Sequence, residues 1–263
     1  LLVHGETLSC FEGGCVACMY KIYPSGYVGD RKLPPNVRPE MCPRSTQQIS
    51  TWTYYRSHHN ILTLGDGDLS FSHALSTLLK EQIPRSVTVS NLVATTHESK
   101  ARLLEVYPQF SDILLQLDEK GVDVRHEVDA TNLAPSLPHK KYTNHFDFIA
   151  WNFPCIRMPR GADGQVEELE TNKQLLRYFF ENCAYLLKNG KGDSEVGEIH
   201  LTHKTIEPFS WWGIEDIAKE CGFKCVAKVV FDKYLFPGYV NKKVLDNKSF
   251  PLHDARVSVN MFP

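Results

Sequence analysis

The chain has 263 residues, 42% of them hydrophobic, and a formal net charge of -2 at pH 7. This length and apolar content suffice for one large α/β domain, and any contact with nucleic acid has to come from local patches, because the overall charge is near zero. No apolar stretch approaches the roughly 18 residues of a membrane helix, so we expect a soluble, intracellular protein with no membrane partner. The first residue is Leu1, which predicts a fragment of a longer protein.

Residues 1–54 are rich in Gly, Pro and Cys and show no sustained periodicity. We expect an irregular N-terminal extension here, followed by one α/β domain over residues 55–263. Two cysteines stand in the CxxC spacing that suits tetrahedral zinc, and two more can complete four thiolates. The candidate structural zinc ligands are Cys10, Cys15, Cys18 and Cys42. The alternative is unliganded thiols in an irregular tail.

Beyond residue 55 the pattern alternates between apolar strands and amphipathic helices, which predicts a βαβ-built, mostly parallel sheet. Strands are expected at 60–64, 86–95, 122–128, 146–152, 197–203, 224–231 and 255–262. Helices are expected at 73–80, 98–107, 109–121, 167–190 and 212–222, and Gly190 is suited to a left-handed cap on the fourth of them.

The segment "NILTLGDGDLSFSHAL" at 60–75 places a glycine loop between a strand and a helix, as ligand loops do. The lysine and hydroxyl of a nucleoside triphosphate loop are missing. In the dinucleotide pattern GxGxxG the third glycine is replaced by Ser70, while Asp66 and Asp68 would repel a pyrophosphate. The carboxylates favour the cationic S-adenosylmethionine. An NAD site and a turn without any ligand are the alternatives.

The next two strands also end in acidic residues at the edge of the predicted sheet. Glu98, after the second strand, is placed to bind ribose hydroxyls. Asp129 and Ala130, after the third, are placed to meet an adenine edge. The alternative is that Glu98 only favours a helix dipole and that Asp129 is a solvated turn residue.

The fourth strand, "FDFIAWNFP", delivers Asn152, Phe153 and Pro154 beside the glycine loop. This segment resembles the Asn/Asp-Pro-Pro-aromatic loop of methyltransferases that act on planar nitrogens. The amide oxygen of Asn152 and the carbonyl before Pro154 can accept hydrogen bonds from a target N–H, while an aromatic ring stacks on the base. The alternative is that Asn152 only organises a turn.

Seven segments occur in order: "LGDGDLSFS", "VATTHES", "GVDVRHEVDATNL", "FDFIAWNFP", "TNKQLL", "GEIHLTHK" and "FPGYVNKK". Together they resemble the large-subunit ribosomal RNA uridine-N(3)-methyltransferase family, including its plant-type relatives, over about residues 54–262. The resemblance implies a class I methyltransferase-like (Rossmann-like) sheet with helices on both faces and an antiparallel strand near the C-terminus. It also implies S-adenosylmethionine as cofactor, a ribosomal RNA substrate and partner, and a nucleolar location.

Carried over by position, the resemblance predicts the site residues. The methyl-donor site would comprise Gly65, Asp66, Gly67, Asp68, Ser70 and Phe71, with Glu98 and Asp129 further along, and the target-base loop would comprise Asn152, Phe153 and Pro154. The segment "CIRMPRGADG" departs from the histidine and glycine-rich turn that commonly follow in the family.

Uridine N(3) is an imide nitrogen that has to lose its proton, so a base or carbonyl polarisation is needed. His203 and Lys204, at the end of the fifth strand, and Asp163 are the candidate bases. The target has to be unpaired or flipped, because its imide edge is buried in a base pair. A catalytically silent RNA-binding or ribosome-assembly factor is the alternative to an enzyme, and an NAD-dependent oxidoreductase is a second one.

Basic and aromatic residues are the candidates for RNA contact. The segments "HKKY" and "RMPR" and the lysine-rich stretch 219–248 supply local positive charge, and Trp211 and Trp212 can stack on bases. The alternatives are a solvated surface for the lysines and a core position for the tryptophans.

Overall fold

The computed structural model describes most of the chain beyond residue 54. It covers residues 55–249, apart from 138, 157–165, 191–195, 206, 232 and 244, together with 255–261 and four short strands nearer the N-terminus. Of the short strands, β1 (Leu2–Val3) pairs with β2 (Glu6–Thr7), and β3 (Tyr27–Val28) pairs with β4 (Arg31–Lys32). The four cysteines proposed as zinc ligands lie outside the described residues, so the zinc site stays a prediction.

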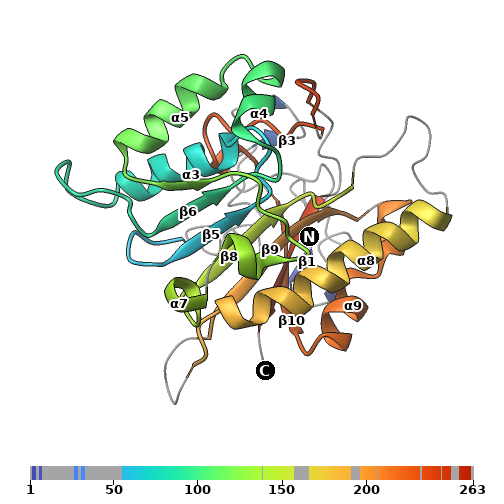
Figure 1. Ribbon diagram of the computed structural model, residues 1–263. Helices are drawn as coiled ribbons and strands as arrows, with labels where there is room; N and C mark the ends of the chain where they lie inside the picture. The colour runs from blue at the N-terminus through green and yellow to red at the C-terminus, as the bar shows by residue number, and fades with distance from the viewer. Residues whose placement is uncertain are drawn as a thin grey trace.

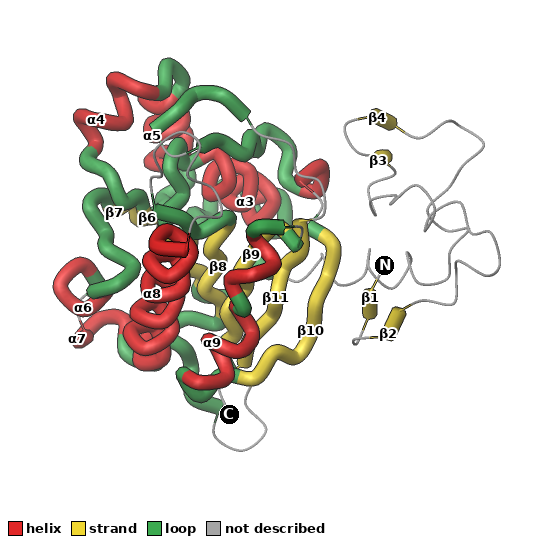
Figure 2. Tube along the Cα trace, turned by 90° about the vertical axis from the view of Figure 1, so that its right-hand side faces the viewer, coloured by secondary structure: helices red, strands yellow, loops and turns green. Residues whose placement is uncertain are grey.

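One seven-stranded sheet forms the centre of the protein (Figures 1 and 2). Its order is β10-β11-β9-β8-β5-β6-β7. The strands are β5 (Ile61–Leu64), β6 (Leu92–Thr95), β7 (Asp123–Arg125), β8 (Phe148–Asn152), β9 (Glu198–Lys204), β10 (Lys224–Val230) and β11 (Ala255–Met261). Strands β5 to β9 pair in parallel, and β11 is antiparallel to both of its neighbours. The expected class I methyltransferase-like sheet is therefore confirmed.

Helices cover both faces of this sheet. In Figure 1, α3, α4 and α5 lie over one face and α8 and α9 over the other. The helices are α3 (Ser70–Lys80), α4 (Lys100–Val106), α5 (Phe110–Glu119), α6 (Leu133–Ser136), α7 (His139–Tyr142), α8 (Val166–Cys183) and α9 (Ile214–Glu220). Three 3-10 turns complete the described helical elements: η3 (Ala184–Leu186), η4 (Phe209–Trp212) and η5 (Lys233–Leu235). No helix in these described parts is long and apolar enough to cross a membrane.

The central strands are buried on both sides because their alternating residues serve two hydrophobic cores. Leu62 and Trp151 belong to the core under α8 and α9. Ile61 and Phe148 belong to the core under α3 and α5. Successive side chains of a strand point to opposite faces, so a strand covered on both sides reads as a continuous apolar run. This explains why the sequence identified these strands directly.

The chain reverses its direction across the sheet between β5 and β8. From β5 it proceeds outward through β6 to β7 and then returns to β8 on the other side. Leu64 at the end of β5 is in register with Trp151 near the end of β8. In open parallel sheets, ligands bind beyond the carboxyl ends of the strands at such a point. The fold therefore places the loops after β5 and β8 at the expected ligand edge.

The helix predicted at 167–190 is shorter than expected. Helix α8 ends at Cys183 and passes into the 3-10 turn η3, so the cap predicted at Gly190 is wrong. The backbone from Leu186 to Lys188 instead pairs with Phe146, whose N–H donates to Leu186 and whose carbonyl accepts from Lys188. Hydrogen bonding to the segment before β8 replaces the continuation of the helix.

Candidate active site

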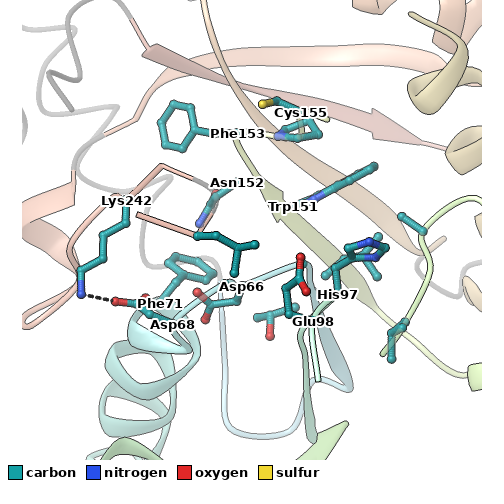
Figure 3. Close-up of a pocket in the computed structure, with 18 of the residues that line it drawn as sticks. Asp66, Asp68, Phe71, His97, Glu98, Trp151, Asn152, Phe153, Cys155 and Lys242 are labelled. Carbon is teal, nitrogen blue, oxygen red and sulfur yellow. Dashed lines mark ion pairs between the residues drawn. The ribbon is translucent and has the colours of Figure 1, made fainter. Parts of the chain in front are cut away.

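A cavity of about 450 Å³ opens at the carboxyl ends of the central strands (Figure 3). The loops after β5, β6, β7 and β8 form most of its wall, and the segment 239–245, between β10 and β11, adds a further side. In Figure 3, Asn152, Phe153 and Cys155 lie on one side of this space, and Asp66 and Glu98 lie on the other. The glycine loop and the WNFP segment therefore meet in one cavity.

Gly65 allows the chain to turn sharply at the end of β5. Its φ is 59°, in the left-handed region, and its N–H donates to Thr95 Oγ1 at 3.2 Å. A Cβ at this position would lie 2.9 Å from Nε1 of Trp151. The position requires glycine both for its backbone conformation and for the close approach of the Trp151 ring.

Replacing Gly65 by alanine is expected to lower the free energy of unfolding by about 1–3 kcal/mol, because the new methyl group combines backbone strain with a clash. Gly67→Ala is the matched control, since a Cβ there would meet Tyr107 Oη at 3.7 Å, an ordinary contact. Thermal denaturation of both variants measures the difference. Equal midpoints for Gly65→Ala and wild type would contradict this assignment.

Asp66 stabilises the beginning of α3. Its Oδ2 accepts hydrogen bonds from the N–H of Ser72 at 2.7 Å and from Ser72 Oγ at 2.6 Å. The first N–H groups of a helix have no partner within the helix, and Asp66 satisfies one of them. Burial, with a smaller contribution from the neighbouring carboxylate of Asp68, raises the pKa of Asp66 to about 7. Near neutral pH this side chain is therefore only partly ionised.

Asp68 is a paired carboxylate. Its Oδ2 lies 2.8 Å from Nζ of Lys242, and its Oδ1 accepts from the N–H and the hydroxyl of Ser70. Gln109 adds a hydrogen bond to Oδ2 at 3.2 Å. The sequence predicted two free negative charges beside the loop. That expectation needs correction, because Lys242 neutralises Asp68 and burial favours the neutral form of Asp66.

The other predicted cofactor residues line the cavity, with the exception of Ser70. Gly65, Gly67, Phe71, Glu98, Asp129 and Ala130 line the cavity. Ser70 is not among the residues that line it, although its Oγ contacts the backbone of Val240 at 3.3 Å and thereby connects α3 to the segment 239–245. Asp129 Oδ1 accepts from the N–H and the hydroxyl of Thr131, which holds the loop after β7 in its turn.

The WNFP segment is held in place by two polar residues of neighbouring elements. Asn152 Oδ1 accepts a hydrogen bond from Thr202 Oγ1 at 2.6 Å, and the N–H of Phe153 donates to the Thr202 carbonyl at 2.8 Å. The amide oxygen of Asn152 is therefore not the free acceptor that the sequence predicted. On α8, the buried Asn172 accepts from the N–H of Ile156 at 3.0 Å.

The sequence assigns no role to Thr202 or Asn172, and it offers Lys242 only as one of the lysines of the stretch 219–248 for RNA contact. A polar residue on the buried face of a helix was the available signal for Asn172, which precedes the buried Leu176 and Phe179 at helical spacing. Lys242 stands in "FPGYVNKK", the last of the seven ordered segments, but the sequence gives no sign of its ion pair with Asp68. Thr202 gave no signal, because a threonine in a strand is an ordinary β-former.

The two predicted bases at the end of β9, His203 and Lys204, do not line the cavity. His203 is buried against the Trp212 ring at 4.4 Å, and burial lowers its pKa to about 4. Lys204 Nζ lies over the Phe209 ring at 4.7 Å. Neither residue is among those that line the cavity. The third candidate, Asp163, lies outside the described residues. Trp212 is a core residue, whereas Trp211 is exposed and accessible to a base.

A metal site is not evident in the described part of the chain, which contains no group of three or more His, Cys, Asp or Glu side chains that could hold an ion. The described cysteines are Cys155, Cys183, Cys221 and Cys225, and Cys155 is exposed at the cavity. Any metal ligands among residues 1–54 are outside these observations.

The sheet order and the cavity together define a methyltransferase-type Rossmann-like domain, with a glycine loop after β5 and a polar-aromatic-proline segment after β8. A family model described as "BMT5-like: rRNA (uridine-N3-)-methyltransferase BTM5-like" matches residues 62–243. The chain belongs to this methyltransferase family, and the match includes the glycine loop, the WNFP segment and Lys242.

The chain is also similar to two plant proteins and to a solved structure. The chain is 32% identical over 192 residues to heavy metal-associated isoprenylated plant protein 41 of Arabidopsis thaliana, a match to 72% of this chain but 34% of that protein. It is 34% identical over 191 residues to an uncharacterized protein of the same plant, covering 72% and 84% of the two chains. A TehB-like SAM-dependent methyltransferase of Corynebacterium glutamicum superposes with a TM-score of 0.42 at 12% identity, over 82% of this chain and 86% of that one.

Proposed function

We propose that the protein transfers a methyl group from S-adenosylmethionine to RNA, and that its target is uridine N(3) of large-subunit ribosomal RNA. The observation that carries the proposal is the meeting of the glycine loop and the WNFP segment in one cavity. The family description supplies the ribosomal RNA and the uridine. A ribosomal RNA substrate is also the reason to propose the nucleolus as the site of action.

The cavity residues fit the proposed cofactor. Gly65 and Gly67 allow a close approach to the backbone, and Glu98 offers a carboxylate to the ribose hydroxyls. Asp129 and Ala130 would flank the adenine, and Asp66 would face the cationic methionyl part. When bound, the cofactor supplies a methyl group made electrophilic by its positively charged sulfur. The volume of about 450 Å³ lies within the range of small-ligand cavities.

The target base would enter on the opposite side of the cavity, where Asn152 and Phe153 lie. Phe153 adopts a left-handed φ of 53°, which is uncommon for a residue with a side chain. Such strain is retained where the surrounding structure imposes it, here through the hydrogen bond to Thr202. The backbone turn at Phe153 brings Pro154 and Cys155 to the cavity wall as well.

Cofactor binding is tested by calorimetric titration of the protein with S-adenosylmethionine. Glu98→Ala is expected to weaken the affinity about tenfold to a hundredfold, because it removes hydrogen bonds to a charged group. The matched control is Glu105→Ala, since Glu105 is an exposed residue of α4 that pairs with Arg102. Absence of heat with the wild-type protein at millimolar ligand would contradict the cofactor assignment.

The substrate is tested by incubating the protein and cofactor with unmodified large-subunit ribosomal RNA and identifying the nucleosides by mass spectrometry. The expected product is 3-methyluridine, and a different methylated nucleoside would overturn the uridine assignment. RNA binding without any methylation, by a protein that binds the cofactor, would instead support a silent assembly factor and contradict the enzymatic proposal.

A further inference from the structure

We propose that Thr202 fixes the orientation of the Asn152 side chain so that its amide N–H group, and not its oxygen, faces the target base. The atom that receives the methyl group is then a ring nitrogen next to a carbonyl group. The site rejects an exocyclic amine as the methylated group. This inference rests on the proposed function, because it assumes that the base enters the cavity beside Asn152. Asn152 acts as a catalytic residue, and Thr202 acts as a positioning residue.

The two residues lie side by side on adjacent parallel strands. Asn152 ends β8 and is in register with Thr202 of β9. Thr202 Oγ1 donates to Asn152 Oδ1 at 2.6 Å, a short hydrogen bond. Thr202 is 1% exposed, while Asn152 is half-buried and lines the cavity. The bond therefore connects a buried hydroxyl to an amide at the cavity surface.

The orientation of the amide follows from the single proton of the threonine hydroxyl. Among the described residues, Thr202 Oγ1 has Asn152 as its hydrogen-bond partner and no other. With the amide reversed, the Asn152 NH₂ group would donate to the hydroxyl, and the hydroxyl proton would be buried without an acceptor. Such an unsatisfied group costs about 1–3 kcal/mol, so the arrangement with the oxygen toward Thr202 is strongly preferred.

The amide nitrogen is left as the polar group available to a ligand. Within the described chain, Asn152 Nδ2 has no hydrogen-bond partner, and the residue lies on the side of the cavity opposite Asp66 in Figure 3. An amide NH₂ group can only donate. The matching group on a base is a hydrogen-bond acceptor, such as the carbonyl oxygen beside an imide nitrogen. An exocyclic amine at the same place would bring one donor against another, which leaves buried polar groups unpaired.

A donor at this position also suits the chemistry of an imide nitrogen. When the ring N–H gives its proton to water, the negative charge spreads onto the adjacent carbonyl oxygen, and the Asn152 N–H group stabilises that charge. The nitrogen lone pair then forms the new bond to the methyl carbon as the carbon–sulfur bond of the donor breaks. The bonding pair returns to sulfur, which loses its positive charge.

The experiment compares methylation of unmodified large-subunit ribosomal RNA by three variants and the wild type. Thr202→Val keeps the shape but removes the hydroxyl, and kcat/KM is expected to fall about tenfold. Thr202→Ser retains the hydroxyl and is expected to remain within about twofold of the wild type. Asn152→Asp replaces the donor by a carboxylate, and kcat is expected to fall about a hundredfold to a thousandfold. Thermal denaturation checks that each variant is folded.

The products distinguish this inference from the proposed function. Formation of 3-methyluridine by the wild type, with equal kcat/KM for Thr202→Val, would overturn the inference and leave the proposed function standing. Formation of 1-methylguanosine would overturn the uridine assignment but support the inference, because that nitrogen also adjoins a ring carbonyl. Methylation of the exocyclic amine of cytidine or adenosine would overturn both. Wild-type activity of Asn152→Asp would also overturn the inference.

Discussion

Replacing Lys242 by methionine is expected to lower the free energy of unfolding by about 3–5 kcal/mol, because it leaves the buried carboxylate of Asp68 without its cation. The side chains of Lys242 and Asp68 are 9% and 4% exposed, and their charged atoms lie 2.8 Å apart. Ser70 and Gln109 continue to donate hydrogen bonds to Asp68. The expected loss of stability is therefore at the lower end of that range. Urea denaturation of the variant against the wild type measures it.

Two further variants separate loss of the ion pair from general damage. Lys243→Met changes an exposed neighbour and is expected to alter stability by less than about 0.5 kcal/mol. The double variant Asp68→Asn with Lys242→Met removes both charges and is expected to recover part of the loss, because no buried charge remains unpaired. If Lys242→Met were as stable as Lys243→Met, the ion pair would not hold the segment 239–245 on the glycine loop.

Replacing Asp66 by asparagine is expected to change how stability depends on pH. The pKa of Asp66 is raised from 3.8 to about 7 in the folded protein. Between these values the unfolded chain loses its proton while the folded protein keeps it, so the wild type loses stability as pH rises from about 4 to about 7. Since a tenfold change in proton affinity is about 1.4 kcal/mol, the whole effect is roughly 4 kcal/mol.

The comparison has to be made between the variant and the wild type across the same pH range. His203 acts in the opposite sense, because its pKa is lowered from 6.5 to about 4 and stability is gained as pH rises through that interval. The asparagine keeps an oxygen for Ser72, so the stability difference between Asp66→Asn and wild type should grow in favour of the variant from pH 4 to pH 8. A constant difference would contradict the raised pKa. Asp118→Asn, at an exposed position of α5, is the matched control.

The segment between β10 and β11 gives the cavity a wall that belongs to the C-terminal part of the chain. Tyr239 packs edge-on against Phe71 at 5.4 Å, and Tyr107 Oη donates to the Lys243 carbonyl at 3.4 Å. Together with the ion pair to Lys242, these contacts attach the segment to α3 and to the end of α4. Cofactor binding and the position of this segment should therefore be coupled, because both involve the loop from Gly65 to Asp68.

The order of strands and helices was predictable because most central strands are predominantly apolar and each long helix has its own periodicity. The meeting of the glycine loop and Asn152 at one edge was predictable too, since the carboxyl ends of parallel strands share an edge. These features depend on local sequence and on one general rule of sheet geometry. The end of α8 was not predictable, because it depends on pairing with the segment at Phe146.

The chemical state of the site was decided only by the tertiary structure. The sequence predicts two negative charges at Asp66 and Asp68, but burial raises the pKa of Asp66 and Lys242 neutralises Asp68. The sequence predicts that the Asn152 amide oxygen accepts from the target base, but that oxygen accepts a hydrogen bond from Thr202 on a neighbouring strand. The sequence determined which polar groups reach the cavity. Folding determined their charge and direction, because both depend on burial and on partners from distant parts of the chain.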